Sequence, residues 1–208
     1  MTAFWTLLGP DFAGKSTALR RLRREHGWRV VSHDDEFLGD RPLISTLRRC
    51  WVDQALRHAG TRYTAELVLS VMHPVILHQR DELDRQATGE GGPLVVDSSY
   101  YKVLAACTLL GVTDDGVFDR WRAMRPPCGV VYLDVPPEVT WERTGPLREV
   151  SAFEHYGPTL TREGFVAFQR DLRALMLEQL ADLPVTMVDG AAPPDEVLAK
   201  IISAVGRS

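Results

Sequence analysis

The stretch Gly9-Pro10-Asp11-Phe12-Ala13-Gly14-Lys15-Ser16 decides the fold of this chain of 208 residues. It matches the pattern G-x-x-x-x-G-K-[ST], in which glycines let the backbone turn so that successive N–H groups face inward. The apolar residues 4–8 precede it and suit a buried strand, while residues 16–25 follow it with leucines at helical spacing. A strand, a glycine loop and a helix N-terminus together predict a binding site for phosphate groups.

The loop residues have separate predicted roles in holding a nucleoside triphosphate, which we take to be ATP. The Lys15 ammonium would reach the β and γ phosphates, and the Ser16 hydroxyl would ligate Mg²⁺. A glycine turn beside a surface lysine is the alternative, but the strand-to-helix context argues against it. The full set of expected nucleotide contacts is Gly9, Asp11, Ala13, Gly14, Lys15, Ser16 and Thr17.

Composition indicates one soluble globular domain that spans residues 1–208. Apolar residues make up 45% and charged residues 25% of the chain, as in ordinary soluble proteins. The net charge of −4 argues against a nucleic-acid partner, and no apolar run approaches the length of a membrane span. Cys50, Cys107 and Cys128 are odd in number and lack metal-ligand spacing, which favours reduced thiols and a cytoplasmic location.

Apolar runs alternate with helical patterns along the chain. Strands are expected at 4–8, 28–32, 94–96, 130–133 and 185–188, and helices at 16–25, 43–57, 65–87, 103–110, 117–124, 137–143, 165–180 and 194–205. This alternation predicts an α/β fold, a doubly wound five-stranded parallel sheet flanked by helices, with ligands at the carboxyl ends of the strands. The Gly-, Pro-, Ser- and Thr-rich stretch 145–161 predicts a lid at about 144–162, with a surface excursion as the alternative.

Carboxylates follow two of the expected strands. Asp34 and Asp35 come after the second strand, and Asp97 ends the third. An alcohol that accepts a phosphoryl group must be oriented and must lose its proton, so Asp34 or Asp35 is a candidate catalytic base. Asp97 is predicted to assist Mg²⁺ together with Ser16, or to polarise the acceptor. Capping of the segment that follows each strand is the alternative.

The order of motifs resembles the thymidylate kinase branch of the P-loop nucleoside and nucleotide kinases. That branch carries an aspartate inside its loop, where Asp11 stands, and a D-R-Y signature after a strand, where this chain has residues 97–100. The likeness covers nearly the whole chain and implies an ATP- and Mg²⁺-dependent kinase that acts on a small molecule, with a homodimer possible. It also implies that Arg143 and Arg148, beside the lid, close over the transferred phosphoryl group.

The acceptor side departs from that branch. Ser98 replaces the arginine of D-R-Y, a second family arginine falls near His73-Pro74, and Phe12 stands where glycine is common. Losing both arginines removes the planar cations best suited to an acceptor phosphate. We also expect Pro74 to kink or interrupt its helix, because proline has no N–H to donate. These departures favour a hydroxyl of a nucleoside or specialised metabolite as the acceptor.

Two other interpretations stay open. The first is a divergent nucleotide kinase whose acceptor phosphate is held by other arginines, such as Arg41 or Arg48. The second belongs to a different class, a P-loop NTPase switch or a regulatory nucleotide-binding module. Against the second, the sequence has no N-K-x-D motif for reading guanine. An intact Lys15-Ser16 pair likewise argues against a decayed kinase that only binds nucleotide.

Overall fold

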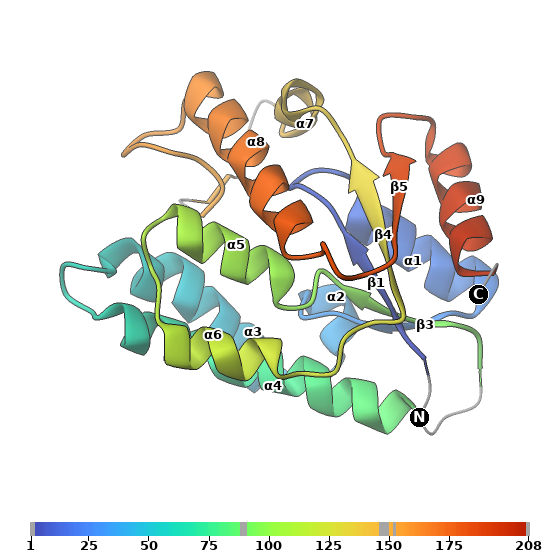
Figure 1. Ribbon diagram of the computed structural model, residues 1–208, viewed down its shortest axis with the longest axis horizontal. Coiled ribbons are helices and arrows are strands. Elements are labelled where there is room, and N and C mark those ends of the chain that lie inside the picture. Colours follow the sequence, from blue (N-terminus) through green and yellow to red (C-terminus); the bar gives the residue numbers. More distant parts are fainter. Residues whose placement is uncertain (1–2, 88–90, 146–149, 152, 207–208) are drawn as a thin grey trace.

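The computed structural model describes residues 3–87, 91–145, 150–151 and 153–206. All five strands within these ranges belong to one parallel sheet of order β2-β3-β1-β4-β5 (Figure 1). This topology confirms the α/β fold class and the doubly wound parallel sheet expected from the sequence. The strands are β1 (Trp5–Leu8), β2 (Arg29–Val31), β3 (Leu94–Asp97), β4 (Gly129–Asp134) and β5 (Val185–Asp189).

The helices follow the expected order with two differences: the short helix at 35–38 was not expected, and the segment 43–57 is divided. That segment is α3, then a π-helical turn η1 (Trp51–Ala55), then a 3₁₀ turn η2 (Leu56–His58). A π-helical turn takes in an extra residue and so changes the direction of the side chains that follow. The helices are α1 (Lys15–His26), α2 (Asp35–Leu38), α3 (Pro42–Cys50), α4 (Ala65–Ala87), α5 (Tyr101–Leu109), α6 (Asp115–Arg122), α7 (Pro137–Arg143), α8 (Arg162–Glu178) and α9 (Pro194–Val205).

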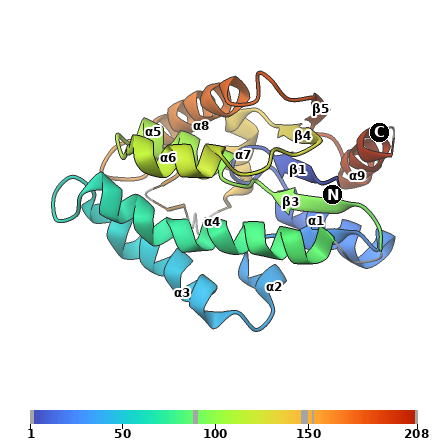
Figure 2. The same cartoon turned by 60° about the horizontal axis from the view of Figure 1, so that its bottom comes forward.

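Helices cover both faces of the sheet, because all of its central strands are apolar on both sides. On one face, Leu19 of α1 and Ile201 of α9 share a buried cluster with Leu7 and Leu133. On the other face, α4, α5, α6 and α8 form a larger cluster that includes Tyr132 (Figures 1 and 2). No helix in the ranges described above is both long and apolar enough to cross a membrane.

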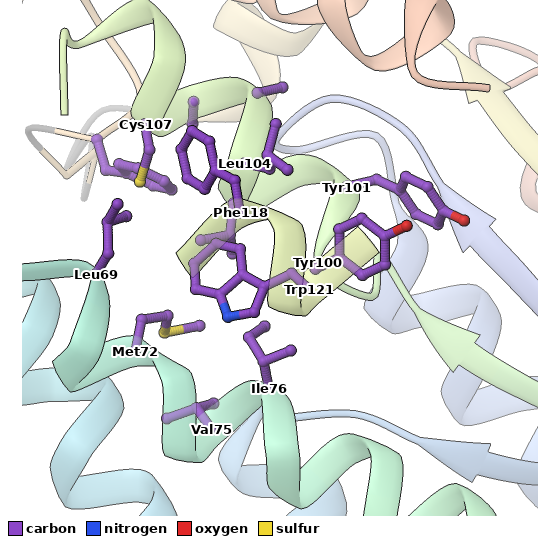
Figure 3. Packing of buried hydrophobic residues seen from close by; sticks show 14 of the residues in the cluster. Leu69, Met72, Val75, Ile76, Tyr100, Tyr101, Leu104, Cys107, Phe118 and Trp121 are labelled. Carbon is purple, nitrogen blue, oxygen red and sulfur yellow. The ribbon is translucent and has the colours of Figure 1, made fainter. Parts of the chain in front are cut away.

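The larger cluster is built around α4, α5 and α6 (Figure 3). Met72 and Ile76 of α4 are each 1% exposed, and Trp121 of α6 is fully buried against them. Tyr100 and Tyr101, which follow β3, belong to the same cluster and do not line the cavity beside the β1–α1 loop. Their role is therefore packing.

Helix α4 runs without a break from Ala65 to Ala87 although Pro74 lies inside it. Of the two outcomes expected from the sequence, a kink or an interruption, the interruption does not occur. Both Pro74 and Ser70, whose carbonyl would have accepted the missing N–H, are exposed, so water can satisfy that carbonyl. The buried residues Met72, Val75 and Ile76 hold the same turns against the core, and this packing outweighs the local cost of proline.

Candidate active site

The loop between β1 and α1 is shaped by backbone conformations that few residues tolerate. A Cβ on Gly9 would lie 2.6 Å from the Leu133 carbonyl oxygen, so no side chain fits there. Gly14 precedes α1 with φ 91°, and Phe12 adopts φ 58°. For a residue with a side chain that conformation costs about 1–2 kcal/mol. The ring of Phe12 lies 6.2 Å from that of Phe165 in α8, which helps to hold the loop in this shape.

A cavity of about 590 Å³ opens at this loop, at the carboxyl ends of the strands. Among the predicted site residues, the loop residues 11–17, Asp34, Asp97 and Arg143 line it, whereas Gly9 and Asp35 do not. Arg148 lies outside the described residues. Residues from other segments complete the lining: His33, Arg48, Arg49, Trp51, Val52, Met72, Ser98, Lys102, Val103, Ser151, Phe153 and Glu154.

Lys15 is folded back onto the loop that carries it. Its Nζ donates to the carbonyl oxygens of Gly9 at 3.0 Å and Pro10 at 2.7 Å. Burial, with a further contribution from the charge of Lys102, lowers the pKa of Lys15 to about 8. An anionic phosphate beside this ammonium would reverse that effect, because an opposite charge favours the protonated form.

Ser16, Asp34 and Arg48 form a hydrogen-bonded chain across the cavity. The Ser16 hydroxyl donates to Asp34 Oδ2 at 3.1 Å, and Arg48 Nη1 donates to Asp34 Oδ1 at 2.9 Å. Asp34 precedes α2 but makes no capping hydrogen bond, so its carboxylate is used in the cavity and not by the helix. Asp35 begins α2, is half exposed, and lies 3.5 Å from Arg48 Nη2. The two aspartates therefore occupy different environments.

Asp97 is held at the end of β3 by two serine hydroxyls. Ser32 Oγ donates to its Oδ2 at 2.9 Å and Ser98 Oγ to its Oδ1 at 3.0 Å, and the side chain is buried. Ser98 and Ser99 both adopt left-handed backbone conformations, with φ 55° and 48°. Such strain persists where the surrounding structure enforces it, and here Ser98 N donates to the Leu7 carbonyl of β1 at 2.9 Å.

A buried ionic cluster lies beneath the loop, and sequence reasoning missed most of it. Lys102, in the first turn of α5, pairs with Asp11, while Gln169 of α8 donates to the other Asp11 oxygen at 3.2 Å. Burial opposes both charges, yet Lys102 holds the pKa of Asp11 below its usual value, and Asp11 holds that of Lys102 above. Burial, reinforced by the charge of Asp11, raises the pKa of Glu154 to about 7. The one feature of the sequence that could have indicated this cluster is the place of Lys102, five residues after Asp97.

Arg143 stands at the rim of the cavity, at the end of α7. Its Nη2 donates to the Gly190 carbonyl at 2.9 Å and its Nη1 lies 3.5 Å from the Phe12 carbonyl. It therefore connects the phosphate loop with the turn after β5. His73, by contrast, lies away from the cavity, where its Nδ1 accepts a hydrogen bond from Trp121 Nε1 at 2.9 Å.

The sheet order, the loop after β1 and the flanking helices define the fold of the P-loop nucleoside and nucleotide kinases. A deoxyadenosine kinase from M. mycoides, solved with the products dCMP and dCDP, superposes with a TM-score of 0.63 at 14% identity. The alignment covers 98% of this chain and 99% of that one. Thymidylate kinase from Candida albicans gives a TM-score of 0.66 at 13% identity, covering 99% and 92% of the two chains. No protein-family model and no curated protein sequence matches the chain.

Proposed function

We propose that the protein is an ATP- and Mg²⁺-dependent kinase that transfers the γ-phosphoryl group to a hydroxyl of a small molecule, a nucleoside or a specialised metabolite. The observation that carries this proposal is the contact between Ser16 of the phosphate loop and Asp34, a carboxylate on the wall of the same cavity. That contact puts a candidate base beside the expected position of the triphosphate. The kinase fold of the two solved structures is consistent with it.

The donor side fits a magnesium-bound triphosphate. Ser16 offers a hydroxyl oxygen on the wall of the cavity, and Mg²⁺ prefers such oxygen donors. Asp97, proposed with Ser16 for the metal, lines the same cavity with both of its oxygens bonded to serine hydroxyls. Mg²⁺, when bound, neutralises charge on the phosphates. The loop N–H groups and the N-terminus of α1 favour the remaining negative charge.

The transfer step then follows from the positions of the side chains. The acceptor hydroxyl gives its proton to Asp34 while its oxygen bonds to the γ-phosphorus, and the bond to the β–γ bridging oxygen breaks as ADP leaves. Lys15 and Lys102, both on the cavity wall, stabilise the negative charge on the phosphoryl oxygens. Arg143 covers the donor side from the rim, and Arg148 is proposed to join it from the lid. Asp35 is kept as the alternative base.

A divergent nucleotide kinase is the second candidate, and one observation favours it. Arg48 lines the cavity, where it can meet an acceptor phosphate, whereas Arg41 lines a different cavity beside β2. Arg48 already pairs with Asp34, however, so an acceptor phosphate would have to compete with that carboxylate. Thymidine and thymidylate, offered to the same enzyme, distinguish the two candidates directly.

Phosphorus NMR of the purified protein with ATP and Mg²⁺ tests the proposal. The acceptor panel contains nucleosides, nucleoside monophosphates and hydroxylated metabolites, and a new phosphate-ester signal formed together with ADP supports a kinase. Phosphoryl transfer in a Lys15→Ala variant that folds normally would contradict the assignment of the donor site. ATP hydrolysis without acceptor, as fast as any transfer, would favour the NTPase switch.

The oligomeric state and location are part of the same proposal. We propose a cytoplasmic protein that forms a homodimer and binds ATP and one small-molecule acceptor. The cytoplasm suits Cys50, Cys107 and Cys128, which carry free thiols, the first and last of them exposed. Light scattering of the purified chain measures its mass in solution, and a monomer of 23.3 kDa would contradict the dimer.

A further inference from the structure

Gln169 of α8 is fully buried, although glutamine side chains in proteins are mostly exposed. Its side-chain amide meets the phosphate loop at two points. The oxygen Oε1 accepts a hydrogen bond from the backbone N–H of Asp11 at 3.2 Å, and Nε2 donates to Asp11 Oδ2 at 3.2 Å. Together these contacts fix both the backbone and the side chain of Asp11.

The same amide also holds the segment that precedes α8. Its Nε2 donates to the Glu154 carbonyl at 3.1 Å, so the amide oxygen and the amide nitrogen are both used. Glu154 lines the cavity, and its carboxylate accepts a hydrogen bond from Ser151 N at 2.9 Å. Gln169 therefore connects the phosphate loop, the segment before α8 and α8 itself.

The three contacts need a side chain that both accepts and donates. A glutamate could accept from Asp11 N–H, but in its ionised form it cannot donate, and it would add a third carboxylate beside Asp11 and Glu154. Gln169 supplies both functions without charge. The other oxygen of Asp11 pairs with Lys102, which lines the cavity, so the orientation of Asp11 also determines where this ammonium group lies.

The loop needs such support because the next residue is strained. Phe12 adopts φ 58°, a conformation that persists where the surrounding structure enforces it. Gln169 fixes the residue before Phe12, and Arg143 Nη1 lies 3.5 Å from the Phe12 carbonyl. A loop that is already held in its binding conformation loses less entropy when a ligand binds, and its affinity is higher for that reason.

We infer that Gln169 is a positioning residue that acts through Asp11 to hold the phosphate loop and Lys102 in place for the triphosphate. The inference rests on the proposed function, since it takes ATP as the ligand of the loop. Gln169 is fully buried and does not line the cavity, so it acts without touching the nucleotide. Its loss should lower the affinity for ATP.

Isothermal titration of ATP and Mg²⁺ into the wild type and Gln169→Met tests the inference. Methionine has a side chain of similar length, but it cannot donate a hydrogen bond and accepts one only weakly. Asp11 and the loop then lose their anchor on α8. We expect the Kd for ATP to rise about tenfold.

Gln179→Met, at the end of the same helix, is the matched control. Gln179 Nε2 donates to the carbonyls of Tyr101 at 3.2 Å and Leu175 at 3.3 Å, and Gln179 does not line the cavity. This variant should lower the thermal unfolding midpoint and yet bind ATP like the wild type. A general loss of stability would instead weaken ATP binding in both variants alike.

Hydrogen exchange of the Asp11 amide, followed by NMR, tests the same contact in the wild type without a substitution. This N–H is bonded to Gln169 Oε1, so it should be protected before ATP is added, and ATP should add little protection. An Asp11 amide that gains its protection only with ATP would overturn the inference, because that N–H would then be a ligand of the phosphates.

Two further results would overturn the inference and leave the kinase proposal intact: unchanged ATP affinity in a folded Gln169→Met variant, or equal losses of affinity in Gln169→Met and Gln179→Met. A wild type that binds no ATP would overturn both. Failure of the proposed function alone looks different. In that case ATP binds with the expected dependence on Gln169, yet no phosphoryl group reaches any acceptor of the panel.

Discussion

The two halves of the cavity are built in different ways. The donor half comes from one contiguous loop, in which glycine φ angles and the N-terminus of α1 create the site locally. The acceptor half brings together Arg48, Trp51, Met72 and Phe153, which lie on four separate segments. In the proposed kinase, phosphate binding therefore depends on local backbone geometry, whereas acceptor recognition depends on tertiary packing.

The largest effect is expected in the donor half, from Lys15→Ala. Loss of this cation should lower kcat by roughly 10³-fold, because the ammonium group no longer stabilises the negative charge that develops on the phosphoryl group. A coupled assay of ADP release measures the rate, and thermal unfolding shows whether the fold survives. Lys200→Ala, at an exposed position of α9, is the control and should leave the rate unchanged. A rate within tenfold of the wild type would remove Lys15 from the mechanism.

The next effect separates the two aspartates where the halves meet. Asp34→Asn should lower kcat by roughly 10²-fold or more, because the acceptor hydroxyl loses its general base. Asp35→Asn should change kcat less than threefold or so, since Asp35 is half exposed and does not line the cavity. Steady-state kinetics on both variants gives the comparison. The reverse order of effects would assign the base to Asp35.

A stability effect is expected from the ionic cluster beneath the loop. Lys102→Met leaves the Asp11 carboxylate buried without its cation, which should lower the free energy of unfolding by about 3 kcal/mol. The double variant Lys102→Met/Asp11→Asn removes both charges and should recover most of that loss. Urea unfolding measures all three proteins. Equal stability of the single and double variants would show that the pair is not coupled.

The smallest effect concerns the pH dependence of stability. The pKa of Glu154 rises from 4.5 when unfolded to about 7 when folded, so the folded protein binds the extra proton between these values. Glu154 therefore favours folding at low pH, and this contribution is lost as pH rises through about 7. Glu154→Gln keeps the contacts with Asp11 and Lys102 but cannot titrate. Between pH 5 and 7 the free energy of unfolding of this variant should therefore lack a pH dependence that corresponds to up to about one bound proton. If the free energy of unfolding depends on pH in the same way in the variant and the wild type, this assignment is contradicted.

The sequence predicted the fold well where the signal is periodic. The bounds expected for the helices at 65–87, 137–143 and 194–205 agree with those of α4, α7 and α9. It did not predict that α4 would continue through Pro74, where core packing outweighs an unfavourable local residue, and it was wrong at residues 51–55, where a π-helical turn replaces regular helix. Neither effect can be predicted from the spacing of apolar residues along the sequence.

The same division applies to the site. Lys15, Ser16 and Asp34 were named from the sequence because a motif and a strand end fix their positions. Trp51 fell within an expected helix, and Glu154 within an expected lid, with nothing to mark either as a cavity residue. Lys102 was marked in the sequence only by its place five residues after Asp97, and its ion pair with Asp11 depends on the packing of α5 beside the loop.

In the proposed kinase, Asp34 has a consequence for how each of the two ligands changes the affinity for the other. Its two oxygens are held from opposite sides, by Ser16 of the donor half and by Arg48 of the acceptor half. A ligand that draws either residue away from Asp34 changes the environment that the other ligand meets. Heterotropic coupling of this kind is reciprocal, so the factor by which the acceptor changes ATP affinity equals the factor by which ATP changes acceptor affinity.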